Sequence, residues 1–108
     1  MKELTAQEAH EHITAGDVVV IDVRSKEEYK AGHIKGSTNI DIAGDDFSAN
    51  IKALPNDKSY LVYCASGGRS SRAGAEMERQ GFLSVINLSG GIAGWRGAGL
   101  PIETPAVE

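Results

Sequence analysis

The sequence predicts a single α/β domain, in which helices cover both faces of a mainly parallel sheet. Residues 18–23 and 60–63 are continuous runs of mostly apolar residues, typical of strands that are buried on both faces. Residues 84–88 form a third such strand, and helix signals lie between the runs. Strands that alternate with helices imply right-handed crossovers between parallel strands. A length of 108 residues fits one compact domain.

The helices are expected from their end signals. Thr5 followed by Glu8 is a capping-box pattern that opens a helix, and Gly16 can close that helix. Ser25 with Glu28 repeats the pattern and starts a second helix, ending at Gly32. A short strand is expected at 39–40, and a helix over 47–54 should stop before Pro55. A further helix is expected over 70–80 with Gly81 as its C-cap, followed by a brief helix around Trp95.

Composition and charge exclude several classes of function. The chain is 41% hydrophobic and 24% charged, as in ordinary soluble domains. Its net charge of −4, with no basic stripe, argues against nucleic-acid binding. No segment has transmembrane length and no apolar leader is present, so we expect no membrane partner. We expect a cytoplasmic protein, or a periplasmic one if a signal peptide was removed.

The single cysteine limits the chemistry that one chain can complete. It excludes an internal disulfide and a metal site built from several thiolates, and we expect neither a metal nor a cofactor. No second cysteine is available to resolve an oxidised or sulfur-loaded thiol. Any redox or sulfur chemistry must therefore be finished by an outside partner.

The strongest candidate site is the loop that follows the strand at 60–63. This loop, called the cysteine loop below, has the sequence Cys64-Ala65-Ser66-Gly67-Gly68-Arg69 and leads into a helix at Ser70. Ligands of open α/β sheets bind at the carboxyl ends of strands, where this loop lies. The paired glycines allow successive N–H groups to converge, and the helix N-terminus adds further donors and a partial positive charge. Together with the arginine, these features predict an anion-binding cradle.

A thiol in such a cradle should be acidic. Free cysteine titrates near ~8.5, and helix N-termini and cationic neighbours lower that pKa. A persulfide on Cys64 would be stabilised by the same donors, because its terminal sulfur also carries negative charge. The alternative is a small buried hydrophobe, which is the usual role of a lone cysteine. The glycine-lined loop favours the nucleophile, since a packing residue does not need such a cradle.

Three short motifs together span almost the whole chain, from Leu4 to Ile102. The first consists of Cys64, Gly67, Arg69 and Ser70; the second of Asp22-Val23-Arg24, Glu28-Tyr29 and residues 32–37; the third of Gly90-Gly91, Trp95 and Gly99-Leu100-Pro101. In this order and spacing, the chain resembles the rhodanese family of sulfurtransferases.

The resemblance implies one domain over residues 1–108, with a core of about 4–102 and a short tail at 103–108. It implies a five-stranded, mostly parallel sheet and a double-displacement reaction. A small-molecule donor such as thiosulfate or a persulfide would load Cys64 with sulfur. A thiol, cyanide or a sulfur-relay protein would remove it. The substrate-binding residues are then Ala65, Ser66, Gly67, Gly68, Arg69 and Ser70. A non-enzymatic sulfur carrier, or an anion-sensing or docking module, remains the alternative.

The loop also differs from two related patterns. Many thiosulfate-using members carry longer polar or basic side chains where this chain has Ala65 and Ser66, so Arg69 is the cation of the loop, with Arg72 one turn further on. Tyrosine phosphatases place five residues between cysteine and arginine and a histidine before the cysteine. Here four residues intervene and Tyr63 precedes. The shorter loop suits a terminal sulfur better than a phosphate monoester.

Structural roles are expected for the other polar and aromatic candidates. Asp22 and Arg24 should pair with each other or brace neighbouring loops through charge-assisted hydrogen bonds. The others are expected to cap helices (Glu28, Ser70), to support the fold by a hydrogen bond (His33), to pack and border the pocket (Trp95), or to lie on different helix faces, which argues against a metal site (His10, His12).

Overall fold

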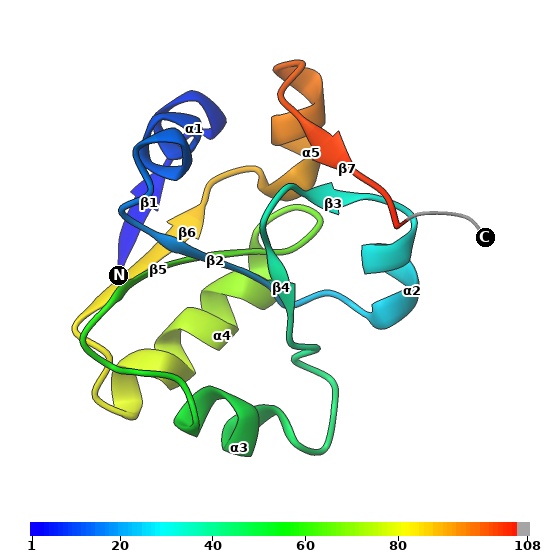
Figure 1. Ribbon diagram of the computed structural model, residues 1–108. Helices are drawn as coiled ribbons and strands as arrows, with labels where there is room; N and C mark the ends of the chain where they lie inside the picture. Colours follow the sequence, from blue (N-terminus) through cyan, green and yellow to red (C-terminus); the bar gives the residue numbers. More distant parts are fainter. Residues whose placement is uncertain (106–108) are drawn as a thin grey trace.

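Five parallel strands form the central sheet of the protein (Figure 1). The computed structural model describes residues 1–105. Across the sheet the strands run in the order β1 (Lys2–Leu4), β6 (Ser84–Leu88), β5 (Ser59–Tyr63), β2 (Val19–Asp22) and β4 (Thr38–Asn39). The five-stranded, mainly parallel sheet predicted from the sequence is confirmed. All carboxyl ends of these strands therefore face the same edge of the sheet.

Helices cover both faces of the sheet, as predicted. They are α1 (Ala6–Ala15), α2 (Lys26–Lys30), α3 (Phe47–Lys52), α4 (Gly68–Arg79) and α5 (Gly91–Gly97). One buried cluster joins the sheet to α3 and α4 through Phe47, Ile51 and Met77. A second cluster joins the opposite face to α1 and α5 through Ala9 and Trp95. Figure 1 shows the two helix layers on either side of the strands.

Both capping boxes predicted from the sequence are present. The Thr5 hydroxyl accepts a hydrogen bond from the Glu8 N–H at 3.2 Å, and α1 ends at Gly16 with a φ of 75°. Ser25 and Glu28 form the equivalent reciprocal pair at the start of α2. These local patterns satisfy otherwise unpaired helix N–H groups. They explain why the two helices begin where the sequence predicts.

Three short strands and the C-terminal end differ from the expectation. The short strands β1, β3 (His33–Ile34) and β7 (Ile102–Glu103) were not predicted, and the last two form a separate antiparallel pair. Glu103, the first residue of the expected tail, lies in β7 opposite His33. The end of the expected tail, residues 106–108, lies outside the described residues. Within residues 1–105, no helix is long and apolar enough to cross a membrane.

Candidate functional site

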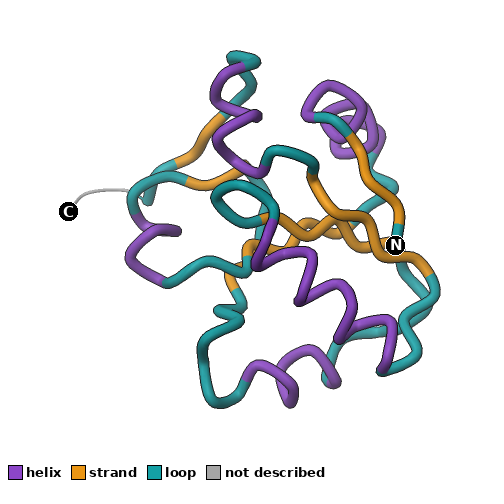
Figure 2. Tube along the Cα trace, turned by 180° about the vertical axis from the view of Figure 1, so that it is seen from behind, coloured by secondary structure: helices purple, strands orange, loops and turns teal. Residues whose placement is uncertain are grey.

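Cys64 lies directly after β5, at the carboxyl edge of the sheet, and is 1% exposed. The loop that follows turns into α4, which starts at Gly68, two residues earlier than predicted. The N-cap is Gly67, whose φ of 119° is open to glycine and strained for other residues. Figure 2, viewed from behind, shows this loop beside the start of α5. The strand, loop and helix thus have the predicted order.

The Cys64 sulfur is surrounded by hydrogen-bond donors. Its Sγ accepts from the Gly67 N–H at 3.0 Å and lies 3.4 Å from the Ser70 Oγ. Burial raises the pKa of the Cys64 thiol, but the Ser70 hydroxyl and the backbone N–H groups of Ser70, Gly67 and Ser66 outweigh it. The net effect is a lowered pKa. The thiolate, which is the nucleophilic form, is favoured.

Ser70 does not cap the helix, contrary to the sequence-based expectation. It is the third residue of α4, and its hydroxyl points back toward the cysteine loop instead of closing the helix end. Its Oγ lies 2.6 Å from Asn87 Oδ1, 3.2 Å from the Gly67 carbonyl and 3.4 Å from the sulfur. A hydroxyl carries one proton, so these acceptors compete for it.

Asn87, on β6, is a site residue that sequence reasoning missed. Its Nδ2 donates to both carboxylate oxygens of Glu3 on β1, at 3.1 Å each. Because Nδ2 faces the carboxylate, Oδ1 must face Ser70 and can only accept from it. Asn87 is 4% exposed, and the other buried residues of its strand, Val85, Ile86 and Leu88, are all apolar. A buried amide within such a run is the signal that could have revealed it.

The start of α5, which carries the glycine pair of the third motif, is hydrogen-bonded to the cysteine loop. The N–H of Ile92 donates to the Cys64 carbonyl at 2.9 Å, and that of Ala93 donates to the Ala65 carbonyl at 3.1 Å. Gly91 has a φ of 58°, and a Cβ at this position would lie 2.5 to 2.6 Å from the carbonyl oxygens of those two loop residues. The start of α5 can approach the loop this closely only with glycine.

Arg69 forms a two-pronged ion pair with Glu28. Its Nη1 donates to Oε1 at 2.7 Å and its Nη2 donates to Oε2 at 3.0 Å. The Arg69 guanidinium lowers the pKa of Glu28 to about 2, and Glu28 in turn raises the pKa of Arg69. Glu28 caps α2 as expected, but the sequence did not reveal this second contact. The charge of the loop arginine is therefore compensated within the protein.

The second motif braces the fold behind the site, as expected. The Arg24 Nη2 donates to Asp22 Oδ2 and to the Gly32 carbonyl, both at 2.7 Å. Both side chains of the pair are buried, and the guanidinium lies 5.7 Å from the centre of the Tyr63 ring. Charge-assisted contacts of this kind fix the geometry of the strand ends.

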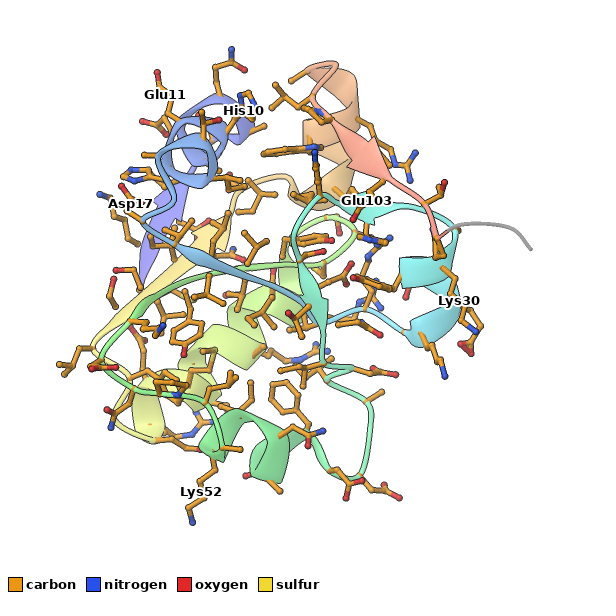
Figure 3. The ribbon with its side chains drawn as sticks, viewed as in Figure 1. His10, Glu11, Asp17, Lys30, Lys52 and Glu103 are labelled. Atoms are coloured by element: carbon orange, nitrogen blue, oxygen red, sulfur yellow. The ribbon has the colours of Figure 1, made fainter. Side chains whose placement is uncertain are left out.

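The histidines have the structural roles predicted for them. His33 Nδ1 lies 2.9 Å from the Tyr29 carbonyl, and the His33 ring stacks on the Tyr29 ring. His33 Nε2 also lies 3.3 Å from Glu103 Oε1. His10 meets the Trp95 ring edge-on, whereas His12 Nδ1 lies 2.9 Å from Asp17 Oδ1, so the two histidines face different ways. Figure 3 labels His10 and Asp17, which lie on different sides of α1. Among residues 1–105, no group of three or more His, Cys, Asp and Glu could hold a metal ion.

Trp95 packs in the core but does not border the cysteine. It is 1% exposed and donates to the Pro101 carbonyl at 2.9 Å. It belongs to the buried cluster with α1, whereas Cys64 belongs to the cluster with α3 and α4. The cavity that Trp95 lines, of about 340 Å³, is shared with His10 and Lys35. The expectation that Trp95 borders the cysteine pocket is wrong, because the sheet separates the two side chains.

Comparison with known proteins places this geometry in a family. The model of the rhodanese-like domain matches residues 5–98. The chain belongs to the rhodanese family. It is 35% identical over 89 residues to a sulfurtransferase of Allochromatium vinosum, covering 82% of this chain and 81% of that protein. It is 40% identical to the putative sulfur carrier protein YrkF of Bacillus subtilis, covering 72% of this chain and 41% of that one.

Solved structures agree with the assignment to the rhodanese family. The crystal structure of a rhodanese-related protein from Thermoplasma volcanium has a TM-score of 0.87 and 32% sequence identity, over 97% of this chain and all of that one. The family assignment and the fold thus rest on both sequence and structure.

Proposed function

We propose that this rhodanese-like domain is a sulfurtransferase that carries sulfane sulfur as a persulfide on Cys64. One observation supports this most strongly: the Cys64 sulfur accepts from the Gly67 N–H at 3.0 Å at the start of α4, and its pKa is lowered. The same donors suit a persulfide, whose terminal sulfur is anionic. The likeness to a named sulfurtransferase supports the same activity.

Loading begins with attack by the Cys64 thiolate on the outer sulfur of the donor. With thiosulfate, the S–S bond of the donor breaks, a new S–S bond forms on Cys64, and sulfite leaves with the electron pair. The total charge of −3 is the same before and after the step. The loop residues Ala65, Ser66, Gly67, Gly68, Arg69 and Ser70 are proposed to bind the donor. Converging N–H groups would stabilise the negative charge on the transferred sulfur.

Unloading returns Cys64 to its thiolate. Cyanide attacks the terminal sulfur, forms a C–S bond and leaves as thiocyanate, while the S–S bond electrons remain on Cys64. A thiol acceptor takes the sulfur in the same way and becomes a persulfide. Because the thiolate is a better leaving group when its pKa is low, the donors around Cys64 help this half-reaction as well.

A sulfur carrier is the second candidate, supported by the likeness to the putative carrier YrkF. A carrier would be loaded once by a protein donor and would release sulfur to a protein acceptor. An enzyme would turn over repeatedly with small molecules.

Steady-state assays separate the two functions. Thiosulfate with cyanide should give thiocyanate, and a persulfide donor with a thiol should give persulfide product, over many turnovers per chain. The Cys64→Ser variant should give none while keeping its fold by circular dichroism. If the folded wild-type protein releases at most one sulfur per chain with every small-molecule acceptor, the enzyme assignment is wrong and the carrier is favoured.

A further inference from the structure

The electrostatics of the cysteine loop point to a preference among sulfur donors. Arg69 is the cation of the loop, and a doubly charged donor such as thiosulfate needs a counter-charge there, since the protein as a whole carries −4. In the structure, both terminal nitrogens of that guanidinium donate to the Glu28 carboxylate, at 2.7 and 3.0 Å. Both ends of the pair are about one-third exposed, so an incoming anion can reach them.

Glu28 is itself fixed in place. Its Oε1 accepts from the Ser25 N–H at 3.1 Å, and its own N–H donates to the Ser25 hydroxyl at 3.2 Å. The capping box of α2 therefore presents the carboxylate to Arg69 in a preset orientation. A donor that recruits Arg69 must displace a carboxylate that stays behind, nearby and unpaired, and that repels a second anion.

Other arginines near the site do not replace this charge. Arg24 is 5% exposed and is neutralised by Asp22. Arg72 lines a different cavity, of about 400 Å³, together with Phe47 of α3 and Glu76 of α4. Backbone N–H groups are then the main source of positive potential at the sulfur. They suit one transferred sulfur atom better than a bulky sulfonate.

We propose that Glu28 is a specificity-determining residue, which neutralises Arg69 and directs Cys64 toward donors of low charge, namely persulfides of small thiols, over thiosulfate. This inference rests on the proposed sulfurtransferase function and deepens it. A small-thiol persulfide carries at most one negative charge, whereas thiosulfate carries two. Cys64 attacks the outer sulfur of the protonated persulfide, and the donor S–S bond breaks. A new S–S bond forms on Cys64 and a thiolate leaves with the electron pair, so the charge stays −1 throughout.

Glu28→Gln tests the proposal, because glutamine keeps an oxygen for the Ser25 N–H but removes the charge and one of the two acceptors that hold Arg69. The matched control is Glu27→Gln, which deletes the same charge from the exposed face of α2. Loading of Cys64 is followed by single-turnover kinetics with thiosulfate and with the persulfide of 2-mercaptoethanol, generated in situ. We expect thiosulfate to load Glu28→Gln roughly ten- to a hundred-fold faster than the wild type. This factor corresponds to the free energy of one charge-assisted contact, which the freed Arg69 could make to the donor. Loading from this persulfide, which carries at most one negative charge, should change less than about threefold. Both loading reactions of Glu27→Gln should also change less than about threefold.

A second variant keeps the result interpretable. In an Arg69→Gln background, Glu28→Gln should no longer accelerate thiosulfate loading, because the freed guanidinium is gone. The proposal is overturned if Glu28→Gln leaves thiosulfate loading unchanged, slows both donors, or gains no more than Glu27→Gln. Failure of the proposed function looks different: neither donor loads wild-type Cys64, although iodoacetamide still alkylates it.

Discussion

Replacing Ser70 by alanine should raise the pKa of the Cys64 thiol by about one unit. The Ser70 hydroxyl lies 3.4 Å from the sulfur and is its side-chain donor, so the variant removes one hydrogen bond to the thiolate. A hydrogen bond to a charged group contributes about 1.5–3 kcal/mol, and one pKa unit corresponds to about 1.36 kcal/mol. The lower end applies here, because Asn87 Oδ1 competes for the same proton at 2.6 Å.

The assay is the rate of alkylation by iodoacetamide as a function of pH. The rate rises as the thiol ionises, so its midpoint reports the pKa. Wild-type Cys64 should give a midpoint below the free-cysteine value of about 8.5. The midpoint of Ser70→Ala should lie higher, and at a pH below both midpoints the variant should react about tenfold more slowly.

Ser71→Ala is the matched control, because it deletes the hydroxyl of the next residue of α4. Its midpoint should equal that of the wild type. The reasoning is refuted if Ser70→Ala leaves the midpoint unchanged or if both variants shift it equally. A wild-type midpoint at or above that of free cysteine would mean that burial outweighs the donors, and Cys64 would then be an ordinary buried thiol.

Two further predictions concern stability, measured by urea denaturation. Gly91→Ala should destabilise the protein by about 1–3 kcal/mol, because its φ of 58° disfavours a side chain and a Cβ would strike two carbonyls of the cysteine loop. Gly97→Ala, on the same helix with open space around it, should stabilise by about 0.5–1 kcal/mol, and the reverse order would contradict the geometry. Asp22→Asn should cost about 3–5 kcal/mol by leaving the buried Arg24 charge uncompensated. Asp17→Asn alters an exposed pair with His12 and should lower the free energy of unfolding by less than about 0.5 kcal/mol. If Asp22→Asn and Asp17→Asn lost equal stability, the buried pair would not have the stabilising role that its burial implies.

Local patterns predicted most of the fold. Each capping box, at Thr5 and at Ser25, spans only four residues, so it can be recognised without any tertiary information. The apolar runs of β2, β5 and β6 show their burial in the same way. Strands of two residues such as β3 and β7 are too short to carry a periodic pattern, and their pairing depends on residues far apart in the chain.

The site was predicted where it is local and missed where it is not. Cys64 and its donors lie within one strand, loop and helix start. The Glu28–Arg69 pair spans 41 residues of sequence, and the Asn87–Glu3 contact spans 84. The capping role of Glu28 could be recognised from its neighbours, whereas its ion pair depends on how α2 and α4 meet. Ser70 was expected to cap a helix for the same reason. Its hydrogen-bond partner Asn87 lies on β6, far along the chain, so local sequence could not reveal the contact.

Intact-mass spectrometry tests most directly whether Cys64 carries sulfur. After incubation with a sulfane donor, either thiosulfate or a small persulfide, the protein should gain the mass of one sulfur atom, and cyanide or a reductant should remove it. Peptide mapping should place the added sulfur on Cys64, and Cys64→Ser should gain nothing. A wild-type protein that stays at its original mass with both donors, while its thiol remains free to react, would contradict the persulfide mechanism.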